Sequence, residues 1–234
     1  MIKVLYRDKF IIAVNKPCGM LSEPSPTEES SVLLETANAE NIPLPLPVHR
    51  LDRNVSGLML LARNSSAAGK FSALVSERAM NKEYLAIVHG KPTEDSGIYK
   101  DLLFKDSSCN KSYVVDKMRK GVKEASLEYR TISVKESEDG ILSLVRIRLH
   151  TGRTHQIRVQ FSSRQTPLFG DGKYGSHTNR GEIALCSARM SFVHPFTKKS
   201  VDIRNLPSPD GYPWNLFADL FKTEMFDESI LDNQ

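Results

Sequence analysis

Short strand-like segments dominate this sequence, and they do not alternate regularly with helices. Patterns typical of strands occupy residues 10–14, 58–62, 82–88, 127–132, 142–149 and 184–193. Patterns typical of helices occupy residues 31–39, 65–78, 154–161 and 214–221, the last as a closing amphipathic helix. Because no regular strand–helix–strand rhythm is present, the sequence predicts an α+β fold, with a largely antiparallel mixed sheet flanked by helices.

The length and composition of the chain limit its class. A chain of 234 residues is long enough for a sizeable core, and no linker divides it, so we predict a single domain over residues 1–225 with a tail at 226–234. No apolar run approaches the roughly 20 residues that cross a bilayer. The three cysteines, Cys18, Cys109 and Cys186, are far apart and typical of reduced thiols. We expect a cytoplasmic monomer that does not enter membranes.

Metal and cofactor motifs are missing from the sequence. It contains neither paired Cys-x-x-Cys spacings nor His-Glu-x-x-His, which are typical of zinc sites. It also contains neither a P-loop nor a dinucleotide fingerprint. The glycine-rich segment GDGKYG at residues 170–175 lacks the Gly-Lys-Ser/Thr ending of a P-loop, and we interpret it as a turn. We therefore expect no metal and no cofactor.

Positive charge is concentrated between residues 140 and 170. This stretch contains no Asp or Glu, yet it carries Arg146, Arg148, Arg153, Arg158 and Arg164. A localised basic stretch indicates a surface that binds a polyanion. The alternative is a solvated strand and helix that happen to carry arginine.

One carboxylate stands alone among cations. Asp52, within the segment HRLDRNVSG at residues 49–57, is the only acidic residue between Glu40 and Glu77. Neighbouring arginines favour its ionised form, which suits a nucleophile or an electrostatic partner. Acid/base hydrolysis of a sugar usually needs a second carboxylate, and none lies nearby in the sequence. The alternative is an ordinary turn or helix-cap aspartate.

Two other segments carry residues suited to chemistry. Tyr84 follows Lys82 at the start of a predicted strand, where an aromatic ring is either part of the core or a surface on which a base can stack. The segment GRTHQIR at residues 152–158 carries two arginines. Arginine pairs bidentately with carboxylate or phosphate, so an arginine placed against Asp52 would keep it ionised. The alternative is a salt-bridged surface.

Together these segments resemble the RluA-like pseudouridine synthases. The family's motifs correspond to HRLDRNVSG at 49–57, KEYLA at 82–86 and GRTHQIR at 152–158, and also to NKPCG at 15–19, KEA at 123–125, PLFGD at 167–171 and HP at 194–195. The resemblance spans about residues 1–205 in the same order, which is more specific than any single motif. One departure is Val55, which replaces the family's usual threonine.

The resemblance implies a fold, an activity and residue roles. It implies a pseudouridine synthase-like catalytic domain with a central RNA-binding cleft, acting as an isomerase on uridine in structured rRNA or tRNA. Asp52 would be catalytic, Tyr84 would stack on the target base, Arg158 would pair with the aspartate, and Arg50 would take the place of the flipped nucleotide. The other residues expected to bind RNA are Arg53, Lys16, Lys82, Arg153, His155 and Gln156.

Several alternatives stay open at this point. The carboxylate could attack C1′ of the ribose or C6 of the base. A non-catalytic RNA-binding or RNA-folding protein would use the same basic segments, and a hydrolase of the nucleoside N-glycosidic bond would release free uracil. The sequence does not distinguish rRNA from tRNA as the substrate.

Overall fold

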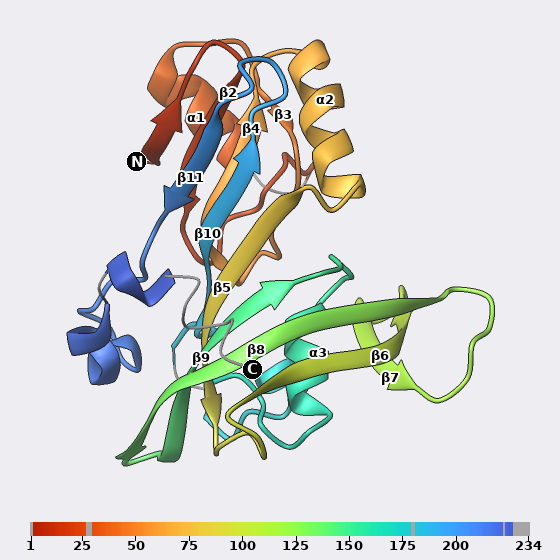
Figure 1. Ribbon diagram of the computed structural model, residues 1–234, viewed down its shortest axis with the longest axis vertical. Coiled ribbons are helices and arrows are strands. Elements are labelled where there is room, and N and C mark those ends of the chain that lie inside the picture. The colour runs from red at the N-terminus through yellow and green to blue at the C-terminus, as the bar shows by residue number, and fades with distance from the viewer. Residues whose placement is uncertain (1, 27–29, 179–180, 222, 227–234) are drawn as a thin grey trace. The chain divides into compact units, whose positions relative to one another are not determined.

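The computed structural model describes residues 2–26, 30–178, 181–221 and 223–226, and the chain folds into two compact units (Figure 1). Unit 1 comprises Met1–Lys82 and Cys186–Leu206, and unit 2 comprises Glu83–Leu185 and Pro207–Gln234. Each unit is therefore assembled from two separate stretches of the chain. This arrangement explains why the sequence contains no segment with the composition of a linker.

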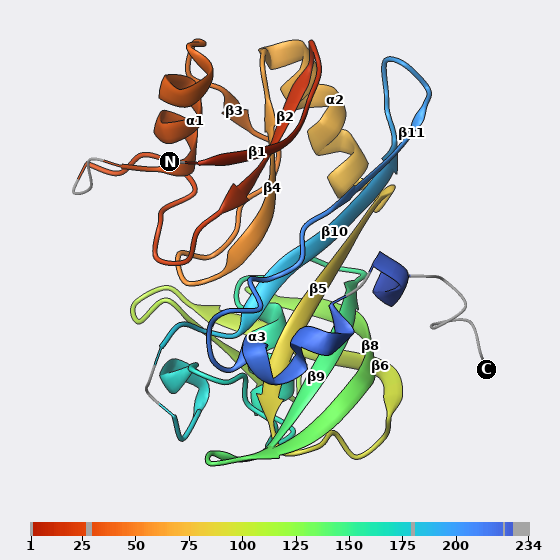
Figure 2. The ribbon, with the colours of Figure 1, turned by 90° about the vertical axis from the view of Figure 1, so that its left-hand side faces the viewer.

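Unit 1 contains a mixed sheet with two helices (Figure 2). Phe71 of α2 is fully buried in the core of this unit, together with Leu58 and Leu60 of β4 and Met190 of β10. The side chain of Asn64 caps α2 by accepting the Ala67 N–H at 2.9 Å. The sheet has the order β1 (Lys3–Arg7), β2 (Ile11–Lys16), β4 (Ser56–Ala62) and β10 (Leu185–Val193), with β3 (Leu46–Pro47) on β4 and β11 (Ser200–Arg204) on β10, and the helices are α1 (Val32–Glu40) and α2 (Ser65–Ser76). Strands β10 and β4 are parallel, whereas the other pairings named here are antiparallel.

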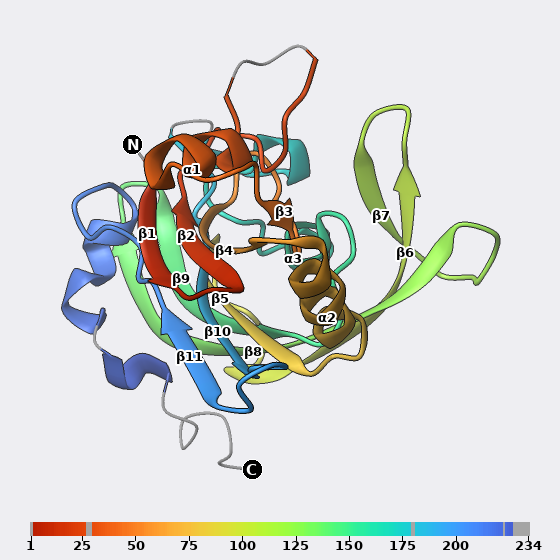
Figure 3. The ribbon, with the colours of Figure 1, turned by 90° about the horizontal axis from the view of Figure 1, so that it is seen from above.

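Unit 2 contains an antiparallel sheet covered by a short helix, α3 (Gln156–Ser162). One sheet face carries Tyr99 and Tyr129, whose rings contact Phe161 of α3. Strands β6 (Ser96–Asp106) and β7 (Lys111–Val115) form the edge of this sheet that lies farthest from β5 (Met80–His89) (Figure 3). The strand order is β5 (Met80–His89), β9 (Gly140–Leu149), β8 (Val122–Ser137), β6 (Ser96–Asp106) and β7 (Lys111–Val115).

The C-terminal segment differs from the prediction. Instead of an amphipathic α-helix over 214–221, the structure has two 3-10 turns, η2 (Trp214–Leu220) and η3 (Thr223–Phe226). The Leu216 carbonyl accepts a hydrogen bond from Lys135 Nζ at 2.6 Å, so a side chain takes an acceptor that an α-helix would use internally. Phe226, assigned to the predicted tail, is buried, and residues 227–234 lie outside the described residues.

The α+β class and the largely antiparallel mixed sheet are confirmed by these elements. The extent of the single domain stays a prediction. Among the described residues, no helix is long and apolar enough to span a membrane.

Candidate functional site

A buried lysine supports the loop that carries Asp52. Lys16, at the end of β2, is fully buried. Its Nζ donates hydrogen bonds to the carbonyl oxygens of Pro17 at 3.0 Å, Arg53 at 2.8 Å and Val55 at 2.8 Å. These bonds fix the main chain on the C-terminal side of Asp52. The prediction that Lys16 contacts RNA is therefore not supported, because its ammonium group lies inside the protein and holds the loop.

The N-terminal side of the loop is fixed in a similar way. Ser22 is buried, and its hydroxyl donates to the Leu51 carbonyl at 2.7 Å while accepting the Leu51 N–H at 3.2 Å. The Val55 N–H then closes a turn by donating to the Asp52 carbonyl at 3.0 Å. Leu51 and Val55 are buried, whereas Asp52 between them is half-buried. The loop therefore buries its apolar side chains in the protein and leaves the Asp52 carboxylate partly exposed.

Both arginines beside Asp52 are exposed. Arg53 Nε donates to the Gly19 carbonyl at 2.9 Å, and the Gly19 N–H donates to the Arg53 carbonyl at 2.9 Å. Arg50 lies 3.3 Å from Glu23, and its side chain is 77% exposed. An exposed ion pair of this kind contributes little stability, so Arg50 can exchange its partner at small cost.

His49 and Lys82 are half-buried bases of unit 1, and the pKa of each is lowered. The His49 imidazole accepts the Leu60 N–H at Nε2, 3.1 Å away, which requires that nitrogen to be unprotonated. Burial, with the charge of Lys82, lowers the pKa of His49 to about 3. Burial also lowers the pKa of Lys82. His49 is thus a neutral structural residue at physiological pH, and the RNA contact of Lys82 stays a prediction.

In unit 2, Tyr84 lies on the sheet face that α3 covers. Tyr84 pairs with Ile147 of β9, which in turn pairs with Tyr129 of β8, so the three side chains share one face. Tyr129 contacts Phe161 of α3 with ring centroids 5.7 Å apart. Tyr84 itself is 7% exposed. Its ring is therefore largely packed and has a restricted orientation.

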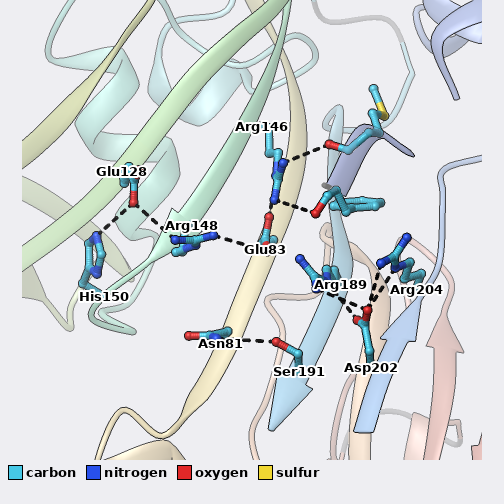
Figure 4. Close-up of polar contacts among 12 residues, drawn as sticks. Asn81, Glu83, Glu128, Arg146, Arg148, His150, Arg189, Ser191, Asp202 and Arg204 are labelled. Carbon is cyan, nitrogen blue, oxygen red and sulfur yellow. Dashed lines mark hydrogen bonds and ion pairs between the residues drawn. The ribbon is translucent and has the colours of Figure 1, made fainter. Parts of the chain in front are cut away.

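The opposite sheet face carries a buried ion pair beside Tyr84, which the sequence did not reveal (Figure 4). Arg146 Nε donates to Glu83 at 2.5 Å, and both side chains are almost completely buried. The two Nη groups of Arg146 donate to the carbonyls of Met225 at 3.0 Å and Phe226 at 3.2 Å. Main-chain carbonyls of the C-terminal segment therefore bind the guanidinium group of Arg146, which lies on β9, the strand beside β5.

Much of the 152–158 motif is internal structure. Gln156 is buried, its Oε1 accepts from Thr151 and from the Arg153 N–H, and its Nε2 donates to the Ser126 carbonyl. The predicted RNA contact of Gln156 is therefore not supported. His155 is also buried, with Nδ1 2.9 Å from the Tyr174 hydroxyl. The half-buried Arg153 donates from Nε to the Glu124 carbonyl at 2.9 Å.

Arg158 is held by a carboxylate that the sequence did not assign to the site. Its Nε and Nη2 donate to the two oxygens of Asp171, at 2.6 and 2.8 Å, and both residues are buried. Asp171 belongs to the glycine-rich segment at 170–175. Its position in that segment is the only feature of the sequence that could have drawn attention to it as a partner of Arg158. The pairing of Arg158 with Asp52 stays a prediction.

Three arginines of the arginine-rich stretch pair with carboxylates that are distant in the sequence. Arg146 pairs with Glu83, Arg158 with Asp171, and Arg164 with Asp101 at 3.0 Å. These carboxylates lie 63, 13 and 63 residues away in the sequence, so a local count of charges could not find them. The positive charge of these three arginines is therefore paired within the protein, and polyanion binding by the stretch stays a prediction.

The described residues contain no cluster of histidine, cysteine, aspartate or glutamate that could hold a metal ion. Cys18 is half-buried, Cys109 is exposed and Cys186 is buried, and none of the three forms a disulfide. Burial raises the pKa of Cys186 to about 12, so this thiol stays protonated.

Comparison with known proteins identifies the family. Residues 10–163 match the sequence model of the RNA pseudouridylate synthase family, a match that begins in unit 1 and ends in unit 2. This chain belongs to that family and is an RNA pseudouridine synthase, an isomerase.

Individual relatives agree with this assignment. An uncharacterised RNA pseudouridine synthase of Aquifex aeolicus is 34% identical over 229 residues, covering 90% of this chain and 71% of the relative. A tRNA pseudouridine synthase C of Haemophilus influenzae is 31% identical, covering 87% of this chain and 92% of the relative. The solved structure of human RNA pseudouridylate synthase domain containing 1 shares the fold, with a TM-score of 0.74 and 22% identity over 89% of this chain and 84% of that one.

Proposed function

We propose that this enzyme uses Asp52 as the nucleophile that converts uridine to pseudouridine within a structured RNA. One observation supports the role most directly. The Asp52 turn is held from both sides by buried donors, Lys16 and Ser22, yet its carboxylate is half-buried, not enclosed. A positioned and accessible carboxylate is what nucleophilic attack requires.

The isomerisation needs no external electron donor or acceptor. The bond from N1 to C1′ breaks, a bond from C5 to C1′ forms, C5 loses a proton, and N1 gains one. The Asp52 carboxylate adds either to C1′ or to C6 and is released unchanged. The reaction therefore consumes no electron donor or acceptor.

Access to the uridine requires the base to leave its stack, which costs a few kcal/mol. In this proposal Tyr84 stacks on the extruded base, a contact worth about 1–3 kcal/mol. The exposed Arg50 occupies the vacated position, and Arg158 offsets the charge of the aspartate. Arg53, Lys82 and Arg153 complete the proposed RNA-binding set, and the buried His155 is left out for the same reason as Lys16 and Gln156.

The proposed substrate is a stem or loop of tRNA or rRNA, and the proposed enzyme acts as a cytoplasmic monomer. Relatives include a tRNA pseudouridine synthase C, which supports tRNA as one candidate. Mapping pseudouridine across total RNA from cells with and without this protein would identify the substrate through the sites that disappear.

The role of Asp52 is tested with RNA that carries tritium at C5 of uridine. Pseudouridine formation releases this tritium, and Asp52→Asn should abolish the release while RNA binding persists. Asp210→Asn, at an exposed position that bonds Ser208, is the matched control and should retain activity. Tritium release by a folded Asp52→Asn enzyme at the wild-type rate would refute the nucleophile assignment.

The same experiment separates the alternatives. An RNA-binding or RNA-folding protein would bind the RNA without releasing tritium. A hydrolase would liberate free uracil, which a synthase does not produce because C5 stays joined to the ribose.

A further inference from the structure

The glycine-rich turn at residues 170–175 has a geometry that only certain residues can adopt. Gly170 has a φ of +78°, and a Cβ at this position would lie 2.4 Å from the Glu182 carbonyl oxygen. Gly175 closes the turn with a φ of +89°. Between them lie Asp171 and the 3-10 helix η1 (Gly172–Tyr174), and three side chains of this segment bond other elements. The tight turn therefore fixes where Asp171, Lys173 and Tyr174 lie.

Asp171 holds one edge of the Arg158 guanidinium. Its two oxygens accept from Nε and Nη2 of Arg158, at 2.6 and 2.8 Å. Asp171 is 1% exposed and Arg158 is 5% exposed, so water does not compete for this pair. A bidentate contact fixes the plane of a guanidinium group as well as its position.

Tyr174 holds the face of the same guanidinium. The Arg158 Cζ lies 5.0 Å from the centroid of the Tyr174 ring, within range of a cation–π contact. The Tyr174 hydroxyl is itself fixed, because it accepts the Ser112 N–H at 2.8 Å and lies 2.9 Å from His155 Nδ1. Arg158 is thus constrained on one edge and on one face.

The turn is also attached to the tip of the β6–β7 hairpin. Lys173 Nζ donates to the carbonyls of Cys109 at 2.8 Å and Asn110 at 2.9 Å. The hydroxyl of Ser112, at the start of β7, donates to the Thr154 carbonyl at 2.7 Å, just before α3. The hairpin, the turn and the helix that carries Arg158 are therefore bonded to one another within unit 2.

We infer that Asp171 and Tyr174 are positioning residues, which set the orientation of Arg158 for the isomerisation. This inference rests on the proposed role of Arg158 in the reaction. A competing explanation is that the cluster only stabilises the fold. The two explanations differ in their consequence, because mispositioning slows the chemical step of a folded enzyme with RNA bound, whereas pure stabilisation changes only the melting temperature.

The test measures single-turnover tritium release at saturating RNA, together with the Kd for RNA and the melting temperature. Asp171→Asn keeps the shape of the side chain but weakens the bidentate contact. Tyr174→Phe keeps the ring but loses the hydroxyl, and Tyr174→Leu loses both. Misplacement of a reacting group by about 1 Å can cost about 100-fold in rate, so we expect Asp171→Asn and Tyr174→Leu to lose about 10- to 100-fold, and Tyr174→Phe less than Tyr174→Leu. The Kd for RNA should change less than about threefold, because in this inference the cluster acts on the chemical step of an enzyme that still holds its RNA.

A matched control lies beside the same helix. Asp101 pairs with both Nη groups of Arg164, just after α3, and thus holds a different arginine from Asp171. Asp101→Asn should therefore retain the wild-type single-turnover rate.

Wild-type rates in folded Asp171→Asn and Tyr174→Leu enzymes would overturn the inference. If Asp171→Asn does not fold, the single-turnover rates of Tyr174→Phe and Tyr174→Leu decide the question. Wild-type rates for both variants would overturn the inference. Failure of the proposed function itself looks different, because wild-type enzyme would then release no tritium from any RNA.

Discussion

Gly57, at the end of the Asp52 segment, is a position where one added methyl group should disrupt unit 1. Its φ is +107°, and a Cβ there would lie 2.3 Å from the carbonyl oxygen of Ser187 and 2.6 Å from its nitrogen. These backbone atoms are close because Ser187 of β10 pairs with Gly57 of β4 in the parallel ladder. Gly57→Ala must therefore move β4 away from β10.

The expected loss has two parts. A side chain at positive φ costs about 1–2 kcal/mol, and an overpacked contact costs about 1–3 kcal/mol more. The total is about 2–5 kcal/mol in the free energy of unfolding. For a chain of this size, each kcal/mol lowers the melting temperature by about 2–4 °C. Gly57→Ala should therefore melt about 10 °C below the wild type.

Gly140→Ala is the matched control. Gly140 has a φ of +85° in the β8–β9 turn, but no atom lies within 4 Å of its ideal Cβ. This variant should lose only the conformational part, about 1–2 kcal/mol. Thermal and urea unfolding followed by circular dichroism would measure both losses. Equal losses in the two variants would show that the contact with Ser187 has no energetic effect, and would refute the reasoning.

Two further predictions concern ionisable side chains inside the protein. Because the pKa of His49 is lowered to about 3, its neutral form stabilises the fold above pH 6.5. This contribution to the free energy of unfolding is lost as the pH falls from 6.5 toward 3, with a slope of up to about 1.4 kcal/mol per pH unit. His49→Gln should therefore flatten the pH dependence of the free energy of unfolding, and an unchanged curve would contradict the burial of a neutral imidazole. Arg146→Met should cost about 3–5 kcal/mol by removing the closer of the two arginines beside the buried Glu83, since Arg148 lies 4.0 Å away, whereas the double variant Glu83→Gln with Arg146→Met should recover much of that loss. Additive losses in a double-mutant cycle measured by urea unfolding would contradict the pairing.

Sequence reasoning predicted the secondary structure well where the apolar pattern was strong. The apolar run at 58–62 forms β4, and the alternating pattern at 142–149 forms β9. It failed at residues 214–221, where a helical apolar spacing coincides with 3-10 geometry. The apolar periodicity predicts which residues are buried. It does not predict that Lys135 donates a hydrogen bond to the Leu216 carbonyl, which an α-helix would use for its own main chain.

For the site, the sequence identified segments more reliably than roles. Lys16 and Gln156 were assigned to RNA because they are polar and lie within motifs, yet both are buried. Lys16 bonds carbonyls and does not face solvent because the fold brings it next to Val55, which is 39 residues away in the sequence. Such contacts have no signature within a local window of sequence.

The buried members of the motifs explain why the motifs need particular residue types. A lysine is required at position 16 because three carbonyls converge on one donor that carries three protons. A glutamine at position 156 supplies both an acceptor to Arg153 and a donor to Ser126, which neither glutamate nor lysine can do. Family membership can therefore be inferred in part from residues with a structural role, since Lys16 shapes the loop that carries Asp52 and Gln156 bonds the start of the helix that carries Arg158. It follows that motif identity is evidence for the local fold first, and that a chemical role for a motif residue has to be argued from the contacts of its own side chain.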